Sequence, residues 1–199
     1  MGKLGFHCID CHQAEDHLPP GRLLTVSVDD KNRLFCTSCH KGEEIHADRR
    51  IDDHAARIAC QTCHIPLMAV KTGTKLSWDW SQAGQDLPGT NEHLYLKIKG
   101  RFTWVAGAEP EYAWYNGTGT RYLLGDKIDP NRTTDIAAPL GDKDDPTARL
   151  YPFKIHRGKQ VYDTEYRHFI LPHTFGDQGF WTKFDWDEAL RIGANVTGL

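Results

Sequence analysis

The six cysteines of this 199-residue chain all fall in pairs with the same spacing, and a histidine follows each pair at once. The three motifs read CIDCH, CTSCH and CQTCH, and no cysteine is left over. They place the thiols and imidazoles at Cys8/Cys11/His12, Cys36/Cys39/His40 and Cys60/Cys63/His64. No other feature constrains the fold as much, because the three motifs fix three attachment sites within the first 64 residues.

The spacing within each motif has a chemical reason. Two residues between the thiols let one helical turn reach the vinyl groups on neighbouring pyrrole rings, and the next residue projects its imidazole under the iron. The motifs therefore predict three covalently bound haem c groups. Zinc and thiol redox chemistry are the alternatives. Three pairs do not divide evenly into four-cysteine zinc sites, and disulfide chemistry gives no reason for the repeated histidine.

The composition is typical of a chain built partly around cofactors. Hydrophobic residues make up 39% and the mean hydropathy is -0.57, which is polar for a globule of this size. Porphyrins would supply the missing apolar surface. The net charge of -3 gives no electrostatic case for nucleic acid. The longest apolar run, residues 65–70, is too short to span a membrane.

Histidine is the second informative residue type. The chain has 11, of which three belong to the motifs. This surplus favours iron held by two imidazoles, which suits electron transfer and leaves no open position for substrate. The histidines outside the motifs are His7, His17, His46, His54, His93, His156, His168 and His173.

Reach along the chain indicates which of these histidines act as distal ligands. His17 lies five residues after the first motif, and five extended residues span at most about 17 Å, nearly all of which is needed to pass a porphyrin edge. His17 is therefore expected to ligate a neighbouring haem, and His46, six residues after the second motif, faces the same limit. His54 precedes the third motif by six residues and can serve that haem or a neighbour. For each of the three, a solvated or capping role is the alternative.

Residues 1–70 form the predicted trihaem-binding region. Short helices are expected around the motifs and over residues 52–59, and residues 23–28 and 33–35 flank a polar turn that predicts a small β-hairpin. The expected fold class is a mostly irregular multihaem cytochrome c fold.

Residues 71–199 contain no haem motif and predict a loop-rich wrap that packs on haems and on a partner, as one structural unit with the first region. Alternation over residues 94–98 predicts a strand that continues after Gly100 through residues 102–104. Asp185 is expected to cap a terminal helix that runs through Ile192 and ends at Gly193.

Five segments carry a family resemblance, namely residues 54–66, 74–84, 110–117, 122–129 and 151–160. They include TKLSWDWSQAG and PEYAWYNG, and they resemble the C-terminal part of octahaem tetrathionate reductase-type multihaem c-type cytochromes. The resemblance implies a periplasmic or cell-surface protein that packs bis-histidine haems in close pairs. Members of this family reduce tetrathionate, and some act on small nitrogen oxyanions or hydroxylamine.

The chain departs from that family in its haem count, because the family carries eight haems and this sequence has three motifs. The family's lysine-ligated catalytic haem is expected in an N-terminal portion that is absent here, so no catalytic residue is assigned. Lys75, Lys154 and Lys159 are expected at the surface or beside haem propionates. Ligation of haems in a missing N-terminal portion or a separate subunit is predicted for His156 and for one of His93, His168 and His173.

Three functions remain open at this point. The chain is an electron-transfer module, the C-terminal portion or a subunit of a multihaem reductase, or a protomer of a polymeric conductive cytochrome. We expect electron transfer, with another multihaem cytochrome chain and redox donor or acceptor proteins as partners. Seven residues before Cys8 leave no room for a signal peptide. A signal is therefore expected to have been removed or to lie outside this numbering, or the chain is part of a larger exported protein. We favour the last, with the protein in the periplasm or at the cell surface.

Overall fold

The structure is a computed structural model that describes residues 5, 7, 36–40 and 45–199. The predicted hairpin at residues 23–35, the first motif with Cys8, Cys11 and His12, and His17 lie outside the described residues. Contacts divide the chain into two compact units, each built from separate segments. Unit 1 holds the described residues up to Pro66 with Tyr112–Arg121 and Asp135–Phe153, and unit 2 holds Leu67–Glu111, Tyr122–Thr134 and Lys154–Leu199.

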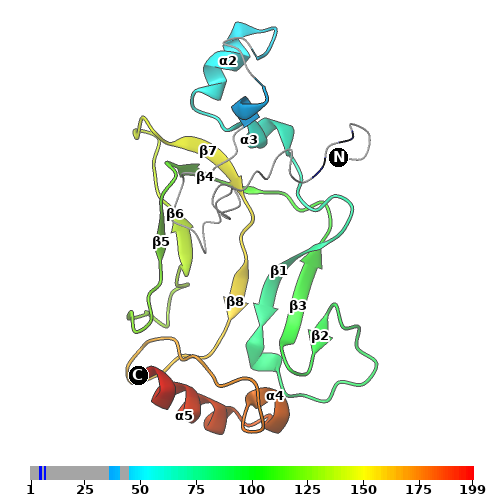
Figure 1. The fold of residues 1–199 in the computed structure, drawn as a ribbon, viewed down its shortest axis with the longest axis vertical. Coiled ribbons are helices and arrows are strands. Elements are labelled where there is room, and N and C mark those ends of the chain that lie inside the picture. The colour runs from blue at the N-terminus through cyan, green and yellow to red at the C-terminus, as the bar shows by residue number, and fades with distance from the viewer. Residues whose placement is uncertain (1–4, 6, 8–35, 41–44) are drawn as a thin grey trace. The chain divides into compact units, whose positions relative to one another are not determined.

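Unit 1 combines short helices with two small pairs of strands (Figure 1). Its helices are η1 (Cys36–Ser38), α2 (Arg49–Ala55) and α3 (Cys60–His64). Its strand pairs are β4 (Glu111–Tyr115) with β7 (Arg149–Phe153), and β5 (Gly119–Arg121) with β6 (Ala137–Pro139). The third motif forms a helical turn, as predicted. Helix α2 starts before the predicted residue 52, because the Asp48 side chain caps it by accepting a hydrogen bond from the Arg50 amide at 2.9 Å.

Strand β7 fixes the third motif in place. The Leu150 carbonyl accepts from the Ala59 amide at 3.0 Å and from the Thr62 hydroxyl at 2.7 Å, and the Leu150 amide donates to the Arg57 carbonyl at 2.9 Å. Ala59 is buried. Helix α3 is therefore anchored at its N-terminal end, and its Cys60 and His64 line a cavity.

Unit 2 is a four-stranded sheet with two helices packed at one end (Figure 1). The strands lie in the order β2 (Tyr95–Leu96), β3 (Gly100–Val105), β1 (Thr74–Asp79) and β8 (Arg157–Lys159). The helices are α4 (Phe180–Lys183) and α5 (Trp186–Thr197), with η2 (Trp80–Gln82) after β1. Buried Ala83, Phe180 and Ala189 form the core between η2 and the helices. Within the described chain, no helix has the length and apolar character needed to cross a membrane.

The predicted strand over residues 94–98 is wrong in its extent. Only Tyr95–Leu96 is a strand, and the chain then reverses through a turn in which the Lys99 amide donates to the Leu96 carbonyl at 2.9 Å. Gly100 completes the reversal with φ +87, so β2 and β3 pair as antiparallel neighbours. The continuation through residues 102–104 is confirmed as part of β3.

The terminal helix begins as predicted but ends later. The Asp185 side chain accepts from the Glu188 amide at 3.1 Å, which confirms the cap. Gly193 lies inside the helix rather than ending it. Glycine is needed there because a Cβ at this position would lie 1.9 Å from the Leu171 carbonyl oxygen. The left-handed residue that ends the helix is Gly198, with φ +72.

The region predicted as a loop-rich wrap contains more strand than expected. Strands β4 to β8 all fall between residues 111 and 159. Each has only three to five residues, so the alternation of polar and apolar side chains is too short to show in the sequence. The predicted division of roles at residue 70 stays a prediction.

Replacement of Gly100 by alanine tests the close approach of β1 to β3. A Cβ at Gly100 would lie 2.1 Å from the Asp79 carbonyl oxygen, in addition to the strain of φ +87. We expect Gly100→Ala to lower the free energy of unfolding by about 3 kcal/mol or more, measured from guanidinium denaturation followed by far-UV circular dichroism.

Gly89→Ala is the matched control, because Gly89 has φ +76 and a Cβ added there would meet nothing within 4 Å. It should cost only about 1 kcal/mol from backbone strain. Equal losses in the two variants would show that the strands can separate without penalty.

Candidate functional site

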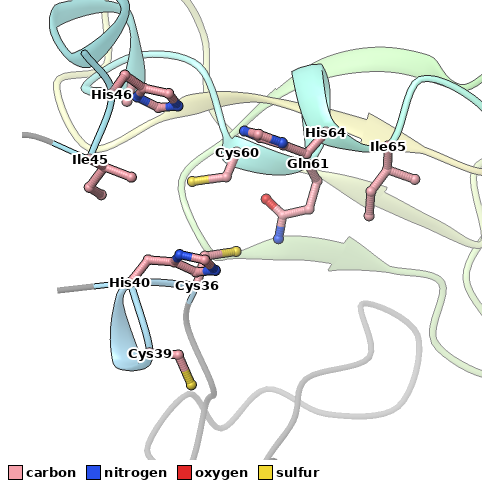
Figure 2. Close-up of a pocket in the computed structure, with 10 residues that line it drawn as sticks. Cys36, Cys39, His40, Ile45, His46, Cys60, Gln61, His64 and Ile65 are labelled. Carbon is pink, nitrogen blue, oxygen red and sulfur yellow. The ribbon is translucent and has the colours of Figure 1, made fainter. Parts of the chain in front are cut away.

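A cavity of about 650 Å³ lies beside the second and third motifs in unit 1 (Figure 2). Cofactor pockets generally measure about 300–1,000 Å³. The cavity is lined by Cys36, Cys39, His40, Ile45, His46, Ala55, Cys60, Gln61, His64 and Ile65. The structure thus brings residues of two predicted haem motifs and one predicted distal histidine around a single space.

His46 and His64 extend toward one another from different segments of the chain (Figure 2). Their ring centroids are 6.1 Å apart and the ring planes are 19° from parallel. An imidazole nitrogen binds a metal ion at about 2 Å, so two imidazoles on opposite sides of one ion have ring centres about 6 Å apart. The spacing therefore fits one metal ion with two axial imidazoles.

Asp52 fixes the orientation of His46. The Asp52 carboxylate lies 2.7 Å from Nδ1 of His46 and also accepts from the His46 amide at 3.2 Å. An ionised carboxylate only accepts hydrogen bonds, so Nδ1 carries the proton and Nε2 keeps its lone pair for a metal. A carboxylate behind a ligating histidine is a common arrangement around protein-bound metals. Asp52 could not be found from the sequence, because His46 lies in the bend before α2 and no regular period relates it to a residue of the helix.

Cys36 of the second motif and Cys60 of the third line the same cavity. Burial raises the pKa of the Cys36 thiol above its ordinary value, and the Cys60 thiol raises it further through its charge and a hydrogen bond. None of the four described cysteines forms a disulfide. No three His, Cys, Asp or Glu side chains in the described part of the chain are grouped to hold a bare metal ion. Cys36, Cys39 and Cys60 around a largely apolar cavity fit attachment to a porphyrin instead.

Arg57 anchors the segment that leads into the third motif. Its guanidinium donates to the carbonyl oxygens of Asp145 at 2.8 Å and Lys143 at 2.5 Å, and it lies 5.0 Å from the centre of the Trp114 ring. These contacts join residues far apart in sequence within unit 1. The sequence analysis also missed this role, since both hydrogen-bond partners are backbone atoms.

The other predicted ligands are placed differently. His54 lies on the exposed side of α2 and does not line the cavity, and Cys63 lies on α3 outside the lining. His156 lies in unit 2, where burial lowers its pKa and the positive charges of Lys154 and Lys75 lower it further. His168 is only 4% exposed, with Nδ1 3.2 Å from the Phe169 carbonyl oxygen. Its burial favours a structural role.

The helical CxxCH turn, the shared cavity and the facing imidazoles define a protein that holds haem through thioether bonds and histidine. Comparisons with known proteins agree with this class. The sequence model of the family described as "Cytochrome c bacterial" matches residues 75–199. The crystal structure of an octaheme cytochrome c from Shewanella oneidensis is 43% identical, with a TM-score of 0.87, and the match covers 96% of this chain. No curated protein matches the sequence.

This chain belongs to the bacterial cytochrome c family, and it is a multihaem c-type cytochrome with covalently bound haem c. The match covers only 45% of the octahaem structure, so the chain spans less than half the length of that relative.

The Arg57 anchor predicts a loss of stability in unit 1. Arg57→Met removes two hydrogen bonds to carbonyl oxygens and the contact with Trp114, and should lower the free energy of unfolding by about 2 kcal/mol. Chemical denaturation followed by circular dichroism measures this. Arg50→Met removes the same charge from a side chain that is 80% exposed and should change stability by no more than about 0.5 kcal/mol. Equal effects of the two substitutions would contradict the anchoring role.

Proposed function

We propose that this chain is a trihaem c-type cytochrome that transfers electrons as part of a larger multihaem assembly. The observation that carries the proposal is the 6.1 Å separation of His46 and His64 at a cavity that is also lined by Cys36, Cys39 and Cys60. When bound, haem iron supplies one-electron chemistry by alternating between its ferric and ferrous states.

In this proposal, Cys60 and Cys63 hold the third haem through thioether bonds, His64 is the proximal ligand and His46 is the distal ligand. His46 follows the second motif in sequence but faces the histidine of the third. This supports the cross-ligation that chain reach predicts. Two imidazoles on one iron leave no position for substrate, which favours electron transfer over catalysis at this site.

The second motif contributes Cys36, Cys39 and His40 to the same cavity. Because Cys36 and Cys60 line the same cavity, haems attached there would lie near one another. Short distances between redox centres suit electron transfer. Cys8, Cys11 and His12 complete the proposed set of three, with His17 and His54 as the proposed distal ligands of the other two haems.

A larger assembly is the proposed setting. The chain matches less than half of a relative whose name describes eight haems, and that match has a TM-score of 0.87. We propose that the partner is another multihaem chain or a further portion of the same one, and that His156 ligates a haem there. Bacterial cytochromes c are typically exported, so the proposed location is the periplasm or the cell surface.

Membership of a reductase is the second candidate. The 43% identity to an octahaem cytochrome favours it over a polymeric conductive cytochrome, because it relates this chain to part of one large multihaem protein. The substrate type, tetrathionate or a nitrogen oxyanion, remains part of the proposal. The catalytic haem of such an enzyme would lie outside this chain.

Replacement of His46 tests its role as a distal ligand. His46→Ala should convert one ferric iron in three from low spin to high spin, because the variant offers no second imidazole to that iron. Electron paramagnetic resonance of the purified haem-loaded chain measures the change. His93→Ala, which alters an exposed histidine of unit 2, should leave the spin state unchanged. A fully low-spin spectrum for His46→Ala would rule out His46 as the ligand.

The hydrogen bond from His46 to Asp52 predicts an effect on reduction potential. Asp52→Asn replaces a charged acceptor with a neutral one, which makes the imidazole less basic and stabilises ferric iron less. One midpoint potential should rise by the equivalent of about 1 kcal/mol in spectroelectrochemical titration. Asp53→Asn removes the same charge from the adjacent exposed position. It controls for the effect that a carboxylate charge has on the midpoint potential without a hydrogen bond to His46. Indistinguishable shifts in the two variants would assign no role to the hydrogen bond.

A further inference from the structure

Strand β1 contains a bulge that turns Lys75 onto an aromatic face of the unit 2 sheet. Lys75 pairs with Trp104 and Ser77 with Thr103, so Leu76 has no partner on β3. Side chains alternate along a regular strand, and residues three apart normally point to opposite faces. The extra residue places Lys75 and Trp78 on one face instead.

The ammonium group of Lys75 lies on a floor of three aromatic rings. Its Nζ is 3.7 Å from the ring centre of Phe102, 5.3 Å from Trp78 and 5.4 Å from Trp104. Phe102 is 5% exposed, whereas Trp104 is 40% exposed, so the floor is closed beneath the lysine and open to solvent beside it. Aromatic faces hold the cation in place but do not neutralise its charge.

Two further lysines lie near this floor. The indole N–H of Trp78 donates to the Lys99 carbonyl, which fixes the backbone of Lys99 beside the rings. Lys154 donates from Nζ to the hydroxyl of Thr74 at 2.7 Å, and Thr74 is the residue before Lys75. Burial lowers the pKa of Lys75, and the charges of Lys99 and Lys154 lower it further.

No described carboxylate forms an ion pair with Lys75, Lys99 or Lys154, although Lys97 in the same unit pairs with Asp86 at 2.7 Å. Cations that repel one another at a half-buried site reduce stability unless an anion joins them. The three lysines therefore form a positively charged group that could bind an anion, and no described side chain supplies that anion.

We propose that Lys75, Lys99 and Lys154 bind an anionic group, a carboxylate or an inorganic oxyanion, above the floor formed by Phe102, Trp78 and Trp104. Two sources offer this chemistry. One is the propionate of a haem held in the assembly, and this source rests on the proposed function. The other is a free oxyanion, whose binding is independent of it.

Calorimetric titration of the purified haem-loaded chain with sulfate tests the free oxyanion. We expect one sulfate per chain, with affinity weakened at least about tenfold in Lys75→Met, because a charge-assisted contact is lost while the unbranched stem still packs on the rings. Lys154→Met, at an exposed position, provides a second variant with the same expectation. Lys183→Met is the control, since it removes an exposed charge that has no part in this cluster.

Potentiometric titration of the same haem-loaded proteins without sulfate tests the propionate. If a propionate occupies the site, wild type takes up no sulfate, and Lys75→Met and Lys154→Met each lower one midpoint potential while Lys183→Met does not. Loss of a cation near a haem disfavours the reduced state, which fixes the sign. Sulfate binding that Lys75→Met leaves unchanged, or neither sulfate binding nor a potential shift, would overturn the proposal. Neither result bears on the role of His46.

Discussion

The gap between the His46 and His64 imidazoles is the constraint on which the arrangement of unit 1 depends. The gap is kept at 6.1 Å between ring centres by two independent supports. Asp52 orients His46 from the first turn of α2, and the Leu150 carbonyl of β7 holds the start of α3 and so sets the place of His64. Neither imidazole belongs to a long helix or strand. Their positions are therefore fixed by a short hydrogen bond and a short strand, whereas in other proteins a large apolar core fixes such positions.

Unit 2 depends on aromatic packing rather than on haem motifs. It has no haem motif, yet the family match at residues 75–199 covers most of it, so the haem-free part of the chain carries much of the family identity. Two groups of its aromatic side chains have distinct roles, the core around Phe180 and the floor beneath Lys75. The first stabilises the packing of α4 and α5 against η2. The second holds the Lys75 ammonium group on its rings, where it is available to an anion.

Local signals in the sequence predicted the features that depend on a few neighbouring residues. The helical turn of the third motif and the Asp185 cap are confirmed because each needs only adjacent side chains and backbone amides. Features set by contacts distant in sequence were not predictable. Gly193 has the appearance of a helix end, but its true constraint is the Leu171 carbonyl, and the reversal at Gly100 depends on its approach to Asp79. The same difference between local and distant contacts explains which residues of the candidate site could be predicted. The candidate ligand His46 follows from chain reach, whereas its partner Asp52 follows only from the fold.

The number of haems attached by thioether bonds is the central claim, and intact-mass spectrometry under denaturing conditions tests it most directly. Denaturation removes any haem that is not covalently bound, so the remaining mass counts thioether attachments. We expect the mass of the 22.6 kDa polypeptide plus three haems. A mass equal to the bare polypeptide, or one with fewer than three haems in protein matured by a host that attaches haem c, would contradict it.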